Sequence, residues 1–129
     1  MIVENFVSFE TAKLLKEAGF DVPCNSQYMQ NGFRWDGGSS NKVNFNEYET
    51  VFSCPTLALA ARWFREKHRI VVDVAFIPPS VNGDVWQYFI GEMDDMVREG
   101  DFESSDRKYS TYEEAFEAGL QETIKLMKE

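Results

Sequence analysis

Apolar residues recur at three- and four-residue spacing in three stretches of the chain, the pattern of helices that bury one face. The stretches are residues 9–18, 55–68 and 112–127. Each has its own start or stop signals, namely Ser8 and Gly19 for the first, Ser53 or Cys54 with Pro55 for the second, and Ser110 or Thr111 for the third. The sequence therefore predicts three helices.

Between these helices, β-branched and aromatic residues predict strands in two pairs. The first pair flanks Asn31-Gly32, a dipeptide typical of the type I′ hairpin turn, in which both central residues take positive φ. The second pair, residues 69–77 and 85–93, is apolar on both faces, which indicates a central or covered place in the sheet. A short strand is also expected to end near Phe52, whereas residues 94–108 have the composition of a loop.

These elements predict one α+β domain over residues 1–129, with three helices packed on a small, mostly antiparallel sheet in the order α-β-β-α-β-β-α. Its apolar content of 43% is enough for a packed core without disulfides or metal. Cys24 and Cys54 are too few for a disulfide framework, so we expect reduced, buried thiols. With no leader and no membrane-spanning run in the sequence, we expect a cytoplasmic location.

Charge is distributed unevenly along the chain. The net charge of −9 argues against binding of nucleic-acid phosphates. Residues 84–117 hold eleven acids against three bases, a net of −8, whereas residues 62–69 carry a net of +3. We therefore expect opposed electrostatic faces, and a homodimer that joins the basic helix of one copy to the acidic loop of another is one consequence.

No group of residues forms a complete catalytic or metal-binding motif. His68 is the single histidine and reads as a half-buried or capping imidazole at a helix end. Cys54 stands about 20 Å from it along one helix, which excludes that nucleophile pair, while a Cys24–His68 pair stays open. Glu92, Asp94 and Asp95 form either an acid/base or cation site or, as we expect, a solvated acidic loop. We predict no catalytic residue, cofactor or metal.

Aromatic residues on the strands offer a core or a binding surface. Trp35, Trp86 and Tyr88 are placed in the core by preference, yet the aromatic surplus is large enough to leave an exposed patch. The candidate interaction surface combines the strand aromatics with the charged segments, and it consists of Arg62, Arg65, Arg69, Trp86, Tyr88, Asp94, Asp95 and Asp101.

Three segments carry a resemblance to known proteins: VSFETAKLLKEAGFDVPC, CPTLALAARWFREKH and YSTYEEAFEAGLQETIKLM. Together they resemble a family of small uncharacterised proteins encoded by bacteriophages and prophages, over somewhat under half of the chain. The resemblance implies an N-terminal helix, a middle helix followed by a hairpin, and a C-terminal helix. It implies no activity and no catalytic residue.

Three functional hypotheses follow from the sequence. The leading one is a non-catalytic protein-interaction module, a phage or prophage accessory factor that binds a protein partner and neither nucleic acid nor membrane. The second is an acidic mimic of nucleic acid that blocks a DNA-binding protein, provided that the carboxylates of residues 92–106 form a ladder. The third is a small metal-dependent hydrolase that uses Glu92, Asp94 or Asp95.

Overall fold

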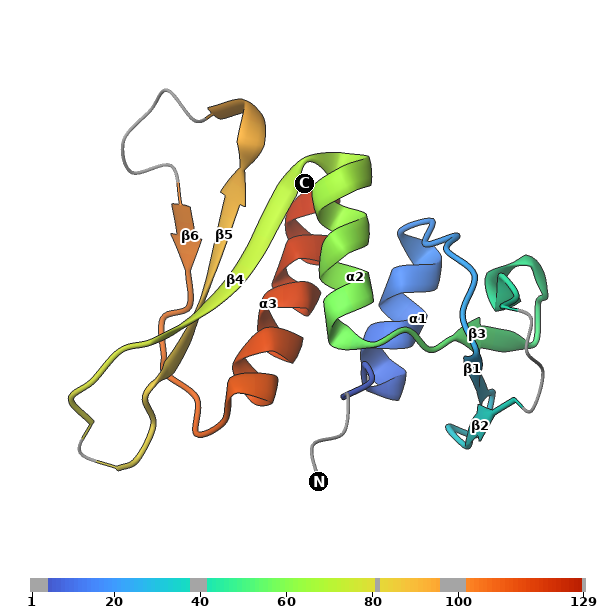
Figure 1. The fold of residues 1–129 in the computed structure, drawn as a ribbon, viewed down its shortest axis with the longest axis horizontal. Helices are drawn as coiled ribbons and strands as arrows, with labels where there is room; N and C mark the ends of the chain where they lie inside the picture. Colours follow the sequence, from blue (N-terminus) through green and yellow to red (C-terminus); the bar gives the residue numbers. More distant parts are fainter. Residues whose placement is uncertain (1–4, 38–41, 81, 96–101, 129) are drawn as a thin grey trace. The chain divides into compact units, whose positions relative to one another are not determined.

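The computed structural model describes residues 5–37, 42–80, 82–95 and 102–128. This part of the chain divides into two compact units, an N-terminal unit within residues 1–60 and a C-terminal unit within residues 61–129, and each is described separately. The elements, shown in Figure 1, are α1 (Phe9–Glu17), β1 (Ser26–Met29), β2 (Arg34–Asp36), β3 (Val51–Ser53), α2 (Leu57–Trp63), β4 (Ile70–Phe76), β5 (Trp86–Glu92), β6 (Phe102–Ser104) and α3 (Tyr112–Met127).

The predicted α+β class and the order α-β-β-α-β-β-α are confirmed, and a third strand, β3 or β6, follows each predicted pair. The strands form two antiparallel three-stranded sheets, β2-β1-β3 in the N-terminal unit and β4-β5-β6 in the C-terminal unit. The boundary between the two units falls within helix α2. The single-domain organisation stays a prediction.

Helix α1 begins at a side-chain cap and ends at a glycine, as predicted. Ser8 Oγ accepts a hydrogen bond from the N–H of Thr11 (3.2 Å), and Gly19 takes a φ of 93° after the helix. The helix buries Thr11, Ala12 and Leu15. The start, the stop and the buried face of α1 were therefore all readable from its sequence.

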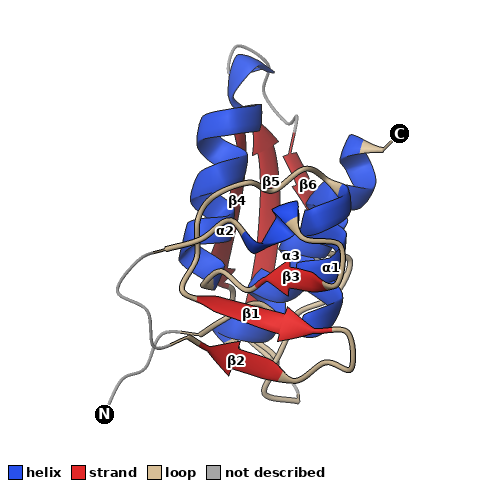
Figure 2. Cartoon of the chain, turned by 90° about the vertical axis from the view of Figure 1, so that its right-hand side faces the viewer, coloured by secondary structure: helices blue, strands red, loops and turns tan. Residues whose placement is uncertain are grey.

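The turn between β1 and β2 differs from the predicted type I′ turn. Gly32 has a φ of 86°, but Asn31 does not take a positive φ. The N–H of Gly32 donates to Met29 O (2.9 Å), and the N–H of Met29 donates to Phe33 O (2.8 Å). These bonds close a three-residue loop with one left-handed glycine, the next commonest hairpin connection. The three strands of this sheet lie side by side in Figure 2.

Lys16 fastens α1 to the segment that leads into β3. Its Nζ donates to Tyr48 O at 2.5 Å and to Val51 O at 2.7 Å, and it lies 4.9 Å from the ring centre of Phe52. Hydrogen bonds from a charged donor are stronger than neutral ones, so this one side chain satisfies carbonyl groups that no strand partner reaches.

We expect Lys16→Met to lower the free energy of unfolding by about 2 kcal/mol, because the charged donor is lost while the stem is kept. Lys13→Met is the matched control, since Lys13 pairs with Glu10 at the surface, and its effect should stay within about 0.5 kcal/mol. Urea unfolding followed by circular dichroism measures both. Equal losses in the two variants would contradict the fastening role.

Helix α2 continues beyond Trp63 as a turn of π-helix over Phe64–His68. The predicted extent of the helix to His68 is thereby confirmed, whereas its widened last turn was not expected. Arg69 ends the helix with a φ of 57°, and its N–H donates to Phe64 O. A positive φ in a residue other than glycine is uncommon, so the exit from this helix is held in place by contacts.

The C-terminal sheet corrects two expectations. The hairpin β4–β5 was expected in a central or covered place, yet only β5 is central, because β6 pairs with it and β4 is the edge strand. Residues 102–104, which were expected within a loop, form β6. Met93–Asp95 form a turn of 3-10 helix after β5.

Helix α3 covers one face of the hairpin β4–β5 (Figure 1). Thr111 Oγ1 accepts a hydrogen bond from the N–H of Glu114 (3.1 Å) at its start, as the capping pattern predicted. The helix comes closest to the sheet at Gly119, where an added Cβ would lie 3.0 Å from Tyr88 Cβ and 3.1 Å from Val72 Cγ1. Even-numbered residues of both strands therefore face α3.

Candidate interaction surface

Of the two strand aromatics predicted in the C-terminal sheet, one is in the core and one is at the surface. Tyr88 is buried against α3. Trp86 is half-buried at the start of β5 and lies opposite Phe76 at the end of β4. Trp86 therefore marks the place where the sheet extends beyond its core.

Trp86 belongs to a row of three aromatic rings, Phe76, Trp86 and Tyr112, which we call the aromatic row. The ring centres of Phe76 and Trp86 are 5.5 Å apart, and those of Trp86 and Tyr112 are 5.6 Å apart. Phe76 is 59% exposed and Tyr112 is 40% exposed. Contact between the rings stabilises all three, yet Phe76 and Tyr112 keep a large part of their surface exposed to solvent.

The aromatic row brings together parts of the chain that are far apart in sequence. Phe76 and Trp86 are a cross-strand pair, and Tyr112 stands in the first turn of α3. Phe116, one turn further along α3, extends the contact inward, with its ring centre 5.8 Å from that of Tyr112. The row is therefore the outer end of the core, held by two strands and one helix.

Two carboxylates act on Tyr112, at one end of the aromatic row. The pKa of the Tyr112 hydroxyl is raised above its usual value, first by burial and then by the carboxylates of Asp73 and Glu113. Two bases lie near Tyr109, the bridge partner of Trp86. The guanidinium of Arg107 lies over the ring of Tyr109, 4.3 Å from the ring centre, and Lys108 Nζ donates to Pro79 O at 3.3 Å. The charges that raise the pKa of Tyr112 are thus those of two carboxylates, and both bases contact other groups.

The predicted basic and acidic segments meet within one chain. Arg69 Nε lies 2.7 Å from Asp94 Oδ1, and Arg62 pairs with Glu66 along the same helix at 3.1 Å. Arg65 is exposed. The Asp95 side chain and all of Asp101 lie outside the described residues. The pairing that we expected between two copies of the chain therefore occurs at Arg69–Asp94 inside a single copy, and the homodimer stays a prediction.

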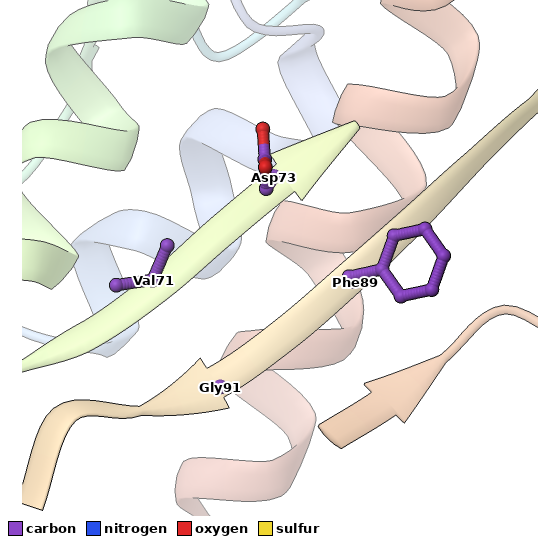
Figure 3. A pocket seen from close by; sticks show the side chains of 4 residues that line it. All are labelled: Val71, Asp73, Phe89 and Gly91. Atoms are coloured by element: carbon purple, nitrogen blue, oxygen red, sulfur yellow. The ribbon is translucent and has the colours of Figure 1, made fainter. Parts of the chain in front are cut away.

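The face of β4 and β5 opposite α3 holds a shallow cavity of about 360 Å³. Figure 3 shows its lining, Val71 and Asp73 from β4 and Phe89 and Gly91 from β5. Gly91 leaves the space because it has no side chain beside Phe89. The lining offers one carboxylate on an apolar floor, which is too little for acid/base chemistry that needs two positioned groups.

Asp73 protects the free edge of β4. The N–H of Met93 donates to Arg69 O, and the N–H of Ile77 donates to Val85 O, so the odd-numbered residues of β4 bond to β5. The backbone N–H and C=O groups of the even-numbered residues of β4 therefore point away from β5, to the unpaired edge of the sheet. Asp73 Oδ1 accepts the N–H of Val74 at 2.9 Å, which removes one donor that another strand would need.

The thiols show no sign of nucleophilic activation. Cys24 and Cys54 are buried and not joined in a disulfide, as predicted. Burial raises the pKa of the Cys24 thiol to about 12, and Cys54 adds to the increase. A reactive cysteine needs a lowered pKa, so the environment of Cys24 opposes the open Cys24–His68 alternative.

His68 is half-buried at the end of the π-helical turn, as expected. Its ring stands edge-on to Trp63, with centres 4.7 Å apart, and its Nε2 has no hydrogen-bond partner among the described residues. Across the described ranges, no cluster of three or more His, Cys, Asp or Glu could hold a metal ion. In the same ranges, no helix combines the length and apolar character needed to cross a membrane.

Comparisons with protein-family models, with curated proteins and with solved structures found no match to this chain. The resemblance to phage and prophage proteins therefore stays a prediction. Sequence reasoning had found Trp86 but missed Phe76 and Tyr112. The register of the β4–β5 hairpin was the available signal for Phe76, because it places that residue opposite Trp86.

Proposed function

We propose that the chain is a protein-interaction module without catalytic activity and that the aromatic row is its binding surface. The observation that carries this proposal is the exposure of large rings that contact one another, with Phe76 at 59% and Tyr112 at 40%. Covering the part of each ring that is still exposed gains on the order of 1 kcal/mol, so burial of the row contributes to binding of a partner. Aromatic residues also dominate the energetics of known protein interfaces.

The proposal includes an accessory role of the kind that small phage and prophage proteins serve. Its support is the resemblance of the three helical segments, together with a surface that combines aromatic rings with the carboxylates of Asp73 and Glu113. Binding rather than turnover is the chemistry that such a surface offers. A protein partner that presents an apolar patch with positive charge would complement it.

The test is affinity capture with the tagged full chain in lysate of its own host cells, with three variants in parallel. Trp86→Ala and Tyr112→Ala should each reduce recovery of the specific partner by at least about ten-fold. Trp35→Ala is the matched control, because Trp35 is 55% exposed on β2, outside the aromatic row, and it should leave recovery unchanged.

Circular dichroism confirms that each variant is folded before its capture is compared. Two results would contradict the proposal: the same proteins recovered at equal amounts with all variants, or no protein recovered with the unmodified chain. If recovery of the partner is lost only with Trp35→Ala, the binding surface lies in the N-terminal unit, and the proposal that the aromatic row is the binding surface is wrong.

No specific observation favours the two other hypotheses. A nucleic-acid mimic needs a ladder of carboxylates over residues 92–106, and residues 96–101 of that segment lie outside the described residues. A metal-dependent hydrolase needs clustered ligands, and Asp94 is occupied by Arg69. Both hypotheses stay predictions from the sequence alone.

A further inference from the structure

Some aromatic rings outside the row are covered by cations of the chain itself. A cation over a ring face is attracted by the negative charge of the π-system. The described residues make four such contacts, with 4.3–4.9 Å between cation and ring centre: Lys13 over Phe9, Lys16 over Phe52, Arg34 over Phe6 and Arg107 over Tyr109. Pairing of cations with rings is thus a recurrent contact in this molecule.

The aromatic row differs from those rings. Within the described residues, no Lys or Arg lies over Phe76, Trp86 or Tyr112. The carboxylates that act on Tyr112 are those of Asp73 and Glu113. This surface therefore combines three exposed or half-exposed rings with two nearby carboxylates, and no cation of the described residues covers its rings.

We propose that the aromatic row binds an arginine or lysine side chain of the partner, which lies over its rings while Asp73 and Glu113 attract the charge. This inference rests on the proposed function and names the chemistry of the partner. Arginine fits best, because its flat guanidinium stacks on a ring and still donates hydrogen bonds to a carboxylate. A lysine offers a point charge without that second contact.

The geometry of the rings favours a cation over a purely apolar ligand. Phe76 and Trp86 stand at 59° to each other, and Trp86 and Tyr112 stand at 86°. Rings at these angles do not form one flat apolar surface, and a cation among them can contact more than one ring. Aromatic cages for cationic ligands use the same arrangement of inclined rings.

The experiment uses nuclear magnetic resonance of the full chain labelled with ¹⁵N, in which each of the three tryptophans gives one indole signal. The probes are a hexa-arginine peptide and its neutral hexa-citrulline analogue, which keeps the size and shape of the side chain. We expect hexa-arginine to shift the Trp86 signal at an at least about ten-fold lower concentration than hexa-citrulline. Trp35 is an internal control, because it is also exposed and should stay unchanged.

Two variants test the named groups. Tyr112→Leu and Glu113→Gln should each raise the hexa-arginine concentration needed for half of the Trp86 shift by at least about three-fold, and 0.5 M NaCl should raise it further. Phe33→Leu, an exposed ring of the N-terminal unit, should change nothing. Equal potency of the two peptides, or equal shifts of Trp35 and Trp86, would overturn the inference.

Failure here and failure of the proposed function give different results. If capture of the partner depends on Trp86 but hexa-arginine acts no better than hexa-citrulline, the row is an interface for a neutral or apolar segment, and only this inference is wrong. If hexa-arginine shifts Trp86 selectively but no partner depends on Trp86, the cation site stands and the proposed function falls.

Discussion

Gly119→Leu is expected to lower the free energy of unfolding by about 3 kcal/mol or more, the largest effect of any single change proposed for this chain. Helix α3 meets the sheet through its backbone at this position. An added Cβ would lie 3.0 Å from Tyr88 Cβ and 3.1 Å from Val72 Cγ1. Cβ atoms of strands are held by the backbone and cannot move aside, so a leucine must push the helix away from the sheet.

Gly119→Ala makes the argument sharper, because two effects of known sign compete. Alanine raises helix propensity by about 0.8–1 kcal/mol over glycine, so an unconstrained site would be stabilised. We expect a net loss instead, from the contact with Tyr88. Lys125→Leu is the control for adding a leucine to α3, since Lys125 is exposed, and it should change stability by about 1 kcal/mol at most.

Urea unfolding measures all three variants. A gain of stability in Gly119→Ala would contradict the close approach of α3 to the sheet. The same series reaches the aromatic row, because displacement of α3 separates Tyr112 from Trp86, whose ring centres are 5.6 Å apart. The hexa-arginine response of Trp86 should therefore weaken in any Gly119 variant that remains folded.

The helices were predictable because their signals are local. The cap at Ser8, the stop at Gly19 and the cap at Thr111 act within a few residues of the chain, and all three are present. The close approach at Gly119 was hidden, although Gly119 belongs to the predicted apolar face, since its meaning depends on what lies across from it. Nor did the sequence indicate the π-helical turn, which depends on how the helix exit is held at Arg69.

The charge pattern was predictable in sequence but not in space. The charges along the chain define a basic helix and an acidic segment, from which we predicted opposed electrostatic faces. The hairpin places Arg69 beside Met93 instead, so Arg69 and Asp94 form an ion pair of 2.7 Å. The register of β4 against β5 contains this information, but a long connection between two strands does not fix their register as a tight turn does.

The aromatic row was only partly predictable, because it too depends on strand register and on long-range packing. Trp86 stood out from composition, and correct register alone would have added Phe76 as its cross-strand neighbour. Tyr112 required the docking of α3 on the sheet, a contact between residues that are 26 positions apart in sequence. Long-range packing decided which aromatics became core, as Tyr88 did, and which remained exposed.

The buried thiol of Cys24 should make the protein less stable as the pH rises above about 8.5, where an ordinary thiol loses its proton. In the folded chain the pKa of Cys24 is raised to about 12, by burial first and by Cys54 second. Between these two values the unfolded chain releases a proton that the folded chain retains, so rising pH favours unfolding. The full stability is present below that window and is lost through it.

Two measurements check the Cys24 prediction. Urea unfolding at pH 7, 9 and 10.5 should show a steeper loss for the unmodified chain than for Cys24→Ala, which has no thiol to ionise at that position. Iodoacetamide labelling at pH 8, mapped to Cys24 by mass spectrometry, should be about a thousand-fold slower in the folded chain than in urea, because only the thiolate reacts. Parallel pH curves for the two proteins, or equal labelling rates in the folded and unfolded chains, would show that Cys24 ionises as freely as an exposed thiol.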